Sequence, residues 1–173
     1  KRMQLHLATA GKALLGELGF NRQEQDLLTA VFAPMRPVDA DSAERLLAEA
    51  GTADWVLKNQ GEGGGHCLFD RDIIHRLGTM TPADHPAWLL MRRLRPAGRA
   101  RPTLVIRAGK AQRVERLVSE VGLFTAHLAD QALPTGNGQT GQVGYLVRSK
   151  PPEVTEGGVH SGFGALDSLF VEG

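Results

Sequence analysis

The residues best suited to chemistry lie in one short stretch, where an apolar strand runs into a glycine cluster. Residues 58–66 read Lys-Asn-Gln-Gly-Glu-Gly-Gly-Gly-His, directly after Trp-Val-Leu. Glycine adopts positive φ angles readily and has no Cβ, so successive backbone N–H groups can turn onto an anion. Lys58 adds a point charge for phosphate oxygens, and Glu62 supplies the hard carboxylate oxygen that Mg²⁺ accepts. The pattern predicts a nucleotide and metal site.

A flexible surface loop is the alternative, and for a glycine cluster alone it is the better interpretation. Lys58 and Glu62 favour the site instead. The stretch is not a P-loop, because its lysine precedes the glycines and no Gly-Lys-Ser/Thr follows, and it lacks the spacing of the dinucleotide-binding motif. His66 and Cys67 have no partner pair at zinc spacing, so local loop packing is their better interpretation.

This stretch resembles the glycine-rich loop of eukaryotic-type glutathione synthetases, which reads Lys-Pro-Gln-Arg-Glu-Gly-Gly-Gly-Asn-Asn and belongs to the ATP-grasp ligases. Further blocks follow in the order that the family has. They are residues 89–91, 119–124, 144–150 leading to 156–159, and 165–167. The resemblance covers nearly the whole chain and implies that it is the C-terminal part of a longer enzyme.

The resemblance implies an ATP-dependent ligation with Mg²⁺. The γ-phosphoryl group of ATP passes to the cysteinyl carboxylate of γ-glutamylcysteine, and the amine of glycine attacks the acyl phosphate to give glutathione, ADP and phosphate. It also implies a homodimer of the full-length enzyme. A cytoplasmic location is expected from the single cysteine and from the lack of a membrane-spanning run or signal-peptide pattern. Two other interpretations stay open: a ligase that uses another amine, such as β-alanine or serine, and a non-catalytic nucleotide-binding fragment.

The same resemblance assigns roles to individual positions. Lys58 and Arg148 are the catalytic residues, Glu62 is the metal ligand, and Arg148, Val159 and His160 bind the peptide substrate. The ATP-binding positions are Lys1, Lys58, Asn59, Gln60, Glu62, Gly63, Gly64, Gly65, His66, Cys67, Phe69, Met91, Arg92, Arg93, Leu94, Glu120, Lys150 and Glu156. Arg148 and Lys150 alternate along one strand, which aims both cations at the same side.

The chain departs from the family pattern at several of these positions. Gly61 replaces an arginine, and His66 and Cys67 replace two asparagines. Arg92 and Glu156 stand where the family has glutamate and aspartate. Phe69 replaces a tyrosine, and His160 and Ser161 replace two alanines. The Lys-Glu-glycine pattern of the loop is kept.

Composition sets wider limits on the function. The 173 residues contain 20 basic and 19 acidic side chains, so charge does not favour nucleic acid or an anionic membrane as a partner. One cysteine, Cys67, rules out an internal disulfide and fits a reducing compartment. No apolar run reaches membrane-spanning length, and no signal-peptide pattern opens the chain.

The first part of the chain has helical patterns. Apolar residues at helical spacing predict an amphipathic helix over residues 3–18, with a glycine after it. Asn21 and Glu24 have the spacing of a capping box and predict the start of a second helix. A third helix is expected from Asp41 to Gly51.

Shorter elements follow the glycine loop. Asp70 is expected to cap a short helix, and residues 81–84 have the cap and first-turn chemistry of another. Residues 88–94 form an apolar run of strand length. Residues 95–102, with two prolines and a glycine, predict a surface connection to a strand over residues 103–107.

The C-terminal part is expected to be mostly strand. Residues 112–121 are spaced for a helix, whereas the resemblance implies a strand that ends at Glu120. We expect strands over residues 123–128 and 143–149 around a hairpin tip at residues 134–141. Residues 153–164 contain four glycines and few apolar anchors, which is typical of a mobile lid.

These elements predict an α+β fold. A helical scaffold is expected over residues 1–52, and an ATP-grasp nucleotide-binding part with an antiparallel sheet over residues 53–173. The second part includes the glycine-rich loop (58–67) and the lid (153–164).

Overall fold

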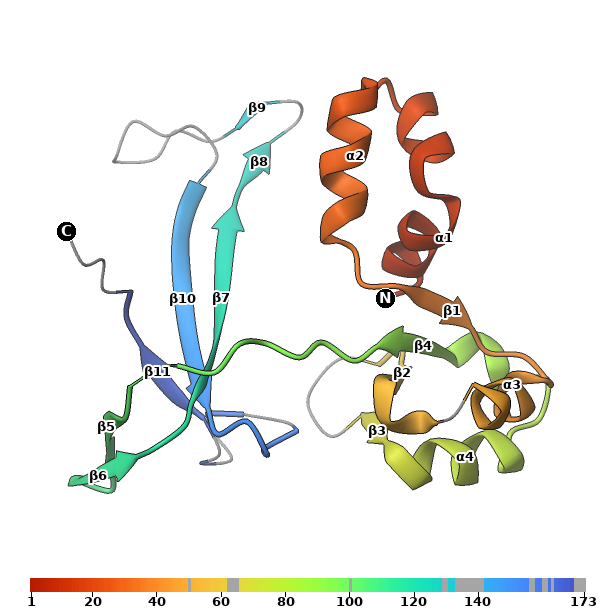
Figure 1. Ribbon diagram of the computed structural model, residues 1–173. Coiled ribbons are helices and arrows are strands. Elements are labelled where there is room, and N and C mark those ends of the chain that lie inside the picture. Colours follow the sequence, from red (N-terminus) through yellow and green to blue (C-terminus); the bar gives the residue numbers. More distant parts are fainter. Residues whose placement is uncertain are drawn as a thin grey trace. The chain divides into compact units, whose positions relative to one another are not determined.

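The computed structural model of the chain forms two compact units, residues 1–95 and residues 96–173. The structure describes all residues except 50, 62–65, 100, 129–130, 133–141, 156–157, 160–161, 163 and 170–173. Both units combine short elements with antiparallel sheet, and helices occur in the first unit only among the described residues (Figure 1). The mixed helix and antiparallel-sheet class expected from the sequence is confirmed.

In its described residues, the first unit contains four α-helices, two 3₁₀ turns and a four-stranded antiparallel sheet. In chain order these are α1 (Arg2–Glu17), α2 (Arg22–Val31), β1 (Met35–Pro37), α3 (Ser42–Ala48), η1 (Thr52–Asp54), β2 (Trp55–Asn59), β3 (Cys67–Phe69), α4 (Asp70–Thr79), η2 (His85–Ala87) and β4 (Trp88–Arg92). The sheet order is β1-β4-β2-β3. β1 lies within residues 1–52, which were expected to form a helical scaffold. The pairing of β1 with β4 therefore joins this scaffold to the sheet.

The core of the first unit lies under β2, whose first three residues are all buried. Leu57 is fully buried and packs with Leu46 of α3, Ile73 of α4 and Leu90 of β4. Burying one leucine in this way contributes about 1.5–3 kcal/mol. Since Lys58 follows Leu57 directly, this core fixes the strand that presents the lysine.

The sequence patterns predict the start of α2 correctly but not the course of α1. The capping box at α2 is confirmed: Asn21 Oδ1 accepts from the Glu24 N–H at 3.0 Å, and Glu24 Oε2 accepts from the Asn21 N–H at 2.8 Å. α1 is kinked at Gly11, where φ is 53°. The kink turns the second half of α1, so Leu15 is buried while Leu18, in the expected apolar series, is exposed.

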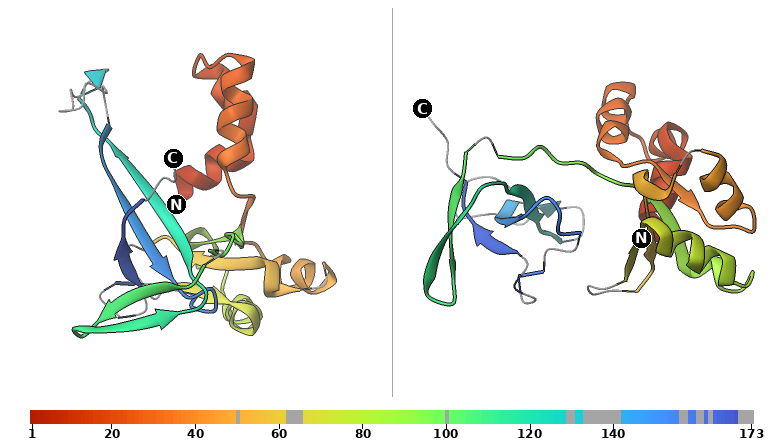
Figure 2. Two further views of the ribbon diagram at one scale, coloured as in Figure 1. Left: turned by 60° about the vertical axis from the view of Figure 1, so that its left-hand side comes forward. Right: turned by 60° about the horizontal axis from the view of Figure 1, so that its bottom comes forward.

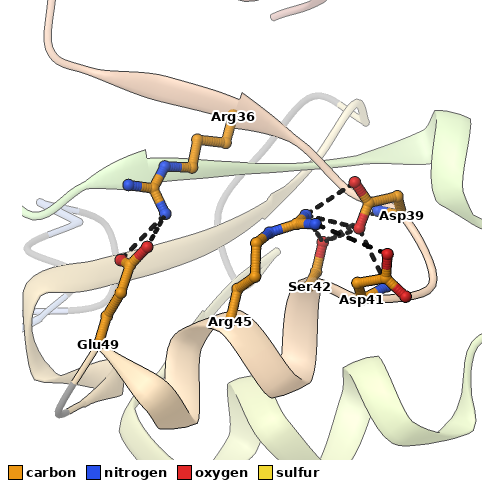
Figure 3. Close-up of polar contacts among 6 residues, drawn as sticks. All are labelled: Arg36, Asp39, Asp41, Ser42, Arg45 and Glu49. Atoms are coloured by element: carbon orange, nitrogen blue, oxygen red, sulfur yellow. Dashed lines mark hydrogen bonds and ion pairs between the residues drawn. The ribbon is translucent and has the colours of Figure 1, made fainter.

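The start of α3 differs in detail from the expected cap. Asp41 occupies the N-cap position, but its side chain makes no capping hydrogen bond. Asp39 takes the central place instead, and its Oδ1 accepts from Ser42 Oγ at 2.9 Å and from Arg45 Nη2 at 2.6 Å (Figure 3). Arg36 of β1 pairs with Glu49 at 2.7 Å just after α3, so the end of the helix is bound to the sheet edge.

Two expectations around α4 are wrong. Asp70 does not cap the helix: it is the first helical residue, has φ of 48°, and follows Phe69 at the N-cap. Residues 81–84 form a turn and not an α-helix, and the Asp84 carboxylate accepts from the N–H and hydroxyl of Thr81 at 2.8 and 2.9 Å. The turn leads into η2, and Pro86 lies within that short element.

The second unit is built on a three-stranded antiparallel sheet with the order β11-β10-β7. Its elements are β5 (Thr103–Arg107), β6 (Lys110–Val114), β7 (Val118–Thr125), β8 (His127–Leu128), β9 (Gln131–Ala132), β10 (Gln142–Lys150) and β11 (Ala165–Asp167). β7 and β10 run side by side as a long twisted pair (Figure 2). β5 pairs with β6, and β8 with β9.

Residues 112–121, whose spacing also allowed a helix, lie mainly in strands, so the helix alternative is wrong. They hold the end of β6, a short connection and the start of β7. β7 does not stop at Glu120 but continues through Gly122 to Thr125. The expected hairpin tip at residues 134–141 lies outside the described residues.

The boundary between the two compact units falls at Arg95, within the predicted connection. Among the described residues, no helix combines the length and the apolar character that a membrane span requires.

Candidate functional site

The glycine loop joins two antiparallel strands, and Lys58 lies at the point where β2 enters it. Lys58 is half-buried and stands opposite Cys67 of β3 and Leu89 of β4. The Asn59 N–H donates to the His66 carbonyl at 3.2 Å and closes the base of the loop. Glu62, Gly63, Gly64 and Gly65 lie outside the described residues. Lys58 is therefore held between two strands at the mouth of the loop.

The entry to the loop is ordered by its own polar groups. Asn59 Oδ1 accepts from the Gly61 N–H at 2.8 Å, which makes a local turn. The Gln60 N–H donates to the carbonyl of Ala87 at 2.9 Å, and Gln60 Oε1 accepts from the Arg2 N–H at the same distance. These bonds place the loop entry against the start of α1.

Lys1 also reaches this place. Its Nζ donates to the carbonyl of Gly61. The structure thus brings together Lys1 and the loop residues that follow Lys58, although about sixty positions separate them in the sequence. Sequence spacing carries no signal for that contact, and the assignment of Lys1 depended on the resemblance alone.

Several other predicted ATP-binding positions of the first unit lie near the end of β4. Phe69 of β3 lies under the guanidinium of Arg93, with 5.4 Å between the Arg93 Cζ and the ring centre. The Arg92 and Arg93 N–H groups donate to the carbonyls of Pro34 at 2.8 Å and Asp54 at 2.7 Å. Arg92 also pairs with Asp54 at 3.0 Å. The backbone N–H groups of Arg92 and Arg93 are therefore hydrogen-bonded within the protein.

The remaining predicted positions on this side differ in exposure. Met91 is half-buried on β4 and stands opposite Val56 of β2. Leu94 is exposed after the strand. His66 is exposed and Cys67 is half-buried in β3.

In the second unit, three predicted residues converge on one face of the β7–β10 pair. Arg148 stands directly opposite Glu120 in the strand register. Arg148 donates to Glu120 through Nε at 3.1 Å and through Nη2, and Lys150 Nζ lies 3.4 Å from Glu120 Oε1. The alternation that predicted one shared face for Arg148 and Lys150 is confirmed. When an anionic ligand binds, Arg148 and Lys150 can donate to the ligand in place of the Glu120 carboxylate.

The surroundings of Glu120 shift its titration. Burial alone raises the pKa of Glu120, but the hydrogen bond from Arg148 and the charges of Arg148 and Lys150 outweigh it, so the pKa lies below the ordinary value. A carboxylate whose pKa is lower in the folded state stabilises the fold above its unfolded pKa. That stability is lost as the pH falls through the folded pKa.

We therefore expect acid to weaken the second unit through Glu120. As the pH falls below about 4.5, the ordinary value for glutamate, the wild-type chain should lose more free energy of unfolding than Glu120→Gln does. Urea unfolding of both proteins across the acid range measures this difference. Parallel losses in the two proteins would show that Glu120 does not contribute.

A second polar cluster lies on the opposite face of the same strands, and the sequence analysis missed it. Arg99 Nη2 donates to Ser119 Oγ at 2.9 Å, to Ser149 Oγ at 3.0 Å, and to Asp167 of β11. Ser149 is buried and donates to Asp167 Oδ2 at 2.8 Å. Burial acts to raise the pKa of Asp167, yet the hydrogen bonds from Ser149, the Ser168 N–H and Arg99 hold it below its ordinary value. The cluster fixes β11 to the sheet.

The predicted lid runs from the end of β10 to the start of β11. Lys150 Nζ donates to the carbonyl of Thr155 at 3.1 Å, which fixes the first turn of the segment. The Gly162 N–H donates to the carbonyl of Val159 at 3.1 Å, and Val159 is half-buried. Glu156 and His160 lie outside the described residues, as does part of the glycine run.

The metal site also depends on a residue outside the described part, Glu62. Among the residues that the structure describes, no group of three or more His, Cys, Asp or Glu side chains is placed to hold a metal ion. Mg²⁺ in nucleotide sites needs only one or two carboxylates, because phosphate oxygens and water complete its coordination. A single glutamate in a phosphate-binding loop is consistent with that requirement.

Comparison with known families decides where the chain belongs. A family model described as the ATP-binding domain of eukaryotic glutathione synthase matches residues 1–171. The chain belongs to this family. The resemblance seen in the sequence is confirmed.

Individual relatives agree with the family assignment. Human glutathione synthetase is 30% identical over 147 residues, which cover 83% of this chain and 30% of the human protein. A chloroplastic glutathione synthetase of Arabidopsis thaliana is 29% identical over 175 residues, 99% of this chain and 31% of the relative. The chain thus spans about a third of the length of the curated relatives that it matches.

A solved structure supports the fold. The apo form of a glutathione synthetase-like effector from Globodera pallida matches with a TM-score of 0.61 and 21% identity. The match covers 97% of this chain and 33% of the effector chain. At that identity the likeness concerns the fold.

Proposed function

We propose that the chain is the ATP-binding part of an enzyme that joins glycine to γ-glutamylcysteine and produces glutathione, ADP and phosphate. The observation that carries this proposal is the convergence of Glu120, Arg148 and Lys150 on one face of the β7–β10 pair. The resemblance gives these three residues to ATP and to the substrate carboxylate. Family membership supports the same function. We also propose an ATP-grasp architecture for residues 53–173.

Each residue has a physical role in this proposal. Lys1 and Lys58 neutralise ATP phosphates at the mouth of the glycine loop, whose backbone N–H groups at Gly63, Gly64 and Gly65 complete the phosphate contacts. Lys150 binds the nucleotide. Arg148 binds the substrate carboxylate, because its planar guanidinium can donate two parallel hydrogen bonds.

The remaining ATP-binding residues are assigned to adenine, to the ribose and to the glycine loop. Adenine is read mainly by the backbone of residues 91–94, which the bonds to Pro34 and Asp54 hold in place. Glu120 binds the ribose. Asn59, Gln60, His66, Cys67, Phe69 and Glu156 complete the ATP-binding set.

Mg²⁺ would be held by Glu62 together with phosphate oxygens, and when bound it neutralises charge on the transferred phosphoryl group. The lid at residues 153–164 excludes water from the acyl phosphate, with Val159 and His160 against the peptide. The anchors for such a lid are the Lys150 contact with Thr155 near its start and the Asp167 cluster after its end.

Two alternatives from the sequence remain distinct from this proposal. A ligase that uses another amine would share every residue named above except those around His160 and Ser161. A non-catalytic nucleotide-binding fragment fits less well, since Lys58, Glu62, Arg148 and Lys150 are all present. The homodimer and the cytoplasmic location stay predictions, and the Arabidopsis thaliana relative is described as chloroplastic.

Titration with ATP tests the nucleotide part of the proposal. We expect Lys58→Ala to weaken ATP binding about tenfold or more, because a charge-assisted contact to phosphate is lost. Binding of γ-glutamylcysteine should change little. Calorimetry on the intact protein that carries this chain measures both affinities, and an unchanged affinity for ATP would remove Lys58 from the site.

A further inference from the structure

Arg99, Ser119, Ser149 and Asp167 form a closed hydrogen-bond network in the second unit. Ser149 has one hydroxyl proton, which it donates to Asp167 Oδ2 at 2.8 Å. The 2.9 Å contact between the two serine oxygens is therefore donated by Ser119. Arg99 donates to Ser119 through Nε at 3.0 Å and through Nη2 at 2.9 Å, and the same Nη2 donates to Ser149 and Asp167. Each hydroxyl proton of the network thus has one defined acceptor.

The network lies at the level of the proposed substrate site but on the other face of the sheet. Ser119 and Ser149 are partners in the register of β7 and β10, and the next pair in that register is Glu120 and Arg148. Successive side chains of a strand point to opposite faces, so the two serines lie behind the two charged residues. Asp167 belongs to β11, on the other side of β10. One guanidinium therefore connects three strands next to the residue that is proposed to bind the substrate carboxylate.

Arg99 is held in place by its own backbone. Its N–H donates to the carbonyl of Leu117 at 2.8 Å, and Gly98 forms a bridge with Val118 at the start of β7. The Arg99 side chain is 29% exposed, so water screens its bonds less than those of an ion pair on the open surface. Ser149 is buried, and an alanine there would need no hydrogen bond. A fully satisfied polar network restricts the strands to one arrangement more strictly than apolar packing does.

We propose that Arg99 is a positioning residue for the carboxylate of γ-glutamylcysteine: it fixes β10 against β7 through the two serines and thereby sets the direction of Arg148. This inference rests on the proposed function, in which Arg148 binds that carboxylate. Arg99 does not touch the substrate, because its guanidinium is bound on the opposite face. Two parallel hydrogen bonds from a guanidinium to a carboxylate tolerate little misalignment, so a small shift of β10 should weaken dipeptide binding.

Arg99→Met tests the inference in the intact protein that carries this chain. Methionine has a long side chain but none of the donors that hold the two serines and Asp167. We expect the KM for γ-glutamylcysteine to rise about threefold to tenfold, the range for one lost hydrogen bond. The KM for ATP should change less, because most of the proposed ATP contacts lie in the first unit. A purely stabilising residue would lower the melting temperature without this difference between the two substrates.

Ser149→Ala is a milder second variant. It removes the hydroxyl that joins Arg99 to β10 and leaves the ion pair of Arg99 with Asp167 in place. The KM for γ-glutamylcysteine should rise in this variant too, by about threefold. The inference therefore stays testable even if Arg99→Met does not fold.

A double-substitution cycle shows whether Arg99 acts through Arg148. Steady-state kinetics are compared for the wild type, Arg99→Met, Arg148→Lys and the double variant. If Arg99 acts by directing Arg148, adding Arg99→Met to the Arg148→Lys protein should lower kcat/KM for the dipeptide by less than about twofold. If the two losses multiply instead, the residues act independently and the inference is wrong.

Arg45→Met is the matched control. Arg45 belongs to a network of the same residue types in the first unit, where its Nη2 donates to Asp39 Oδ1 at 2.6 Å and to Ser42 Oγ at 3.2 Å (Figure 3). This variant should lower the melting temperature and leave both KM values unchanged. The inference is overturned if Ser149→Ala keeps the wild-type KM for the dipeptide, or if Arg45→Met raises that KM equally. A wild-type protein that forms no ADP with ATP, Mg²⁺, dipeptide and glycine would overturn the proposed function itself, which the other outcomes leave standing.

Discussion

Glu62→Gln is expected to reduce turnover about 100-fold or more while leaving the fold intact. The substitution keeps the shape of the side chain but removes the negative charge that would hold Mg²⁺ against the ATP phosphates. Groups that stabilise charge in a transition state are commonly worth about 100- to 1,000-fold in turnover. The measurement is the rate of ADP formation as a function of Mg²⁺ concentration, at saturating ATP and dipeptide.

Binding of Mn²⁺ in the presence of ATP, followed by electron paramagnetic resonance, gives a readout that is independent of turnover. Glu62→Gln should bind the ion more weakly. Glu17→Gln, an exposed glutamate on α1, is the control and should match the wild type in both measurements. Normal turnover of Glu62→Gln at limiting Mg²⁺ would refute the assignment of the metal ligand.

Arg148→Lys is expected to lower kcat/KM for γ-glutamylcysteine about 10- to 100-fold. Lysine keeps the positive charge but loses the planar pair of donors that suits a carboxylate. The affinity for ATP should change less, because Lys150 keeps its own contact with Glu120. Steady-state kinetics with each substrate varied in turn separate the two effects.

The control for this substitution is another arginine of the second unit that is paired with a glutamate. Arg113 pairs with Glu115 at 2.8 Å, and both side chains are exposed. Arg113→Lys should leave both kinetic constants unchanged. If Arg148→Lys raised KM for ATP and for the dipeptide equally, Arg148 would be acting through the nucleotide site and not as a carboxylate ligand.

Local patterns predicted local structure well. The capping box of Asn21 and Glu24 is correct because both partners lie within one helical turn. The shared face of Arg148 and Lys150 is correct because strand alternation depends only on sequence spacing. The same kind of contact does not guarantee a helix: the Asp84 carboxylate accepts from the N–H of Thr81, yet residues 81–84 form a turn that leads only into the short η2.

Contacts between distant parts of the chain could not be predicted in this way. Lys1 meets Gly61, and Arg99 meets Asp167, across separations of 60 and 68 residues. No spacing rule connects such positions, so the resemblance identified Lys1 while Arg99 was missed. The β5–β6 hairpin was also missed, because its turn needs positive φ at Ala108 and Gly109, and alanine rarely adopts that conformation.

The central claim is that a phosphoryl group passes from ATP to the peptide carboxylate before the amine attacks. The most direct measurement uses γ-glutamylcysteine with ¹⁸O in its cysteinyl carboxylate, together with ATP, Mg²⁺ and glycine, and the intact protein that carries this chain. The carboxylate oxygen that bonds to phosphorus leaves with the phosphate when the amine displaces it. We predict that ADP, phosphate and glutathione form in equal amounts and that the phosphate carries one ¹⁸O atom. Phosphate without the label, or ATP consumption that does not depend on the dipeptide, would contradict the account.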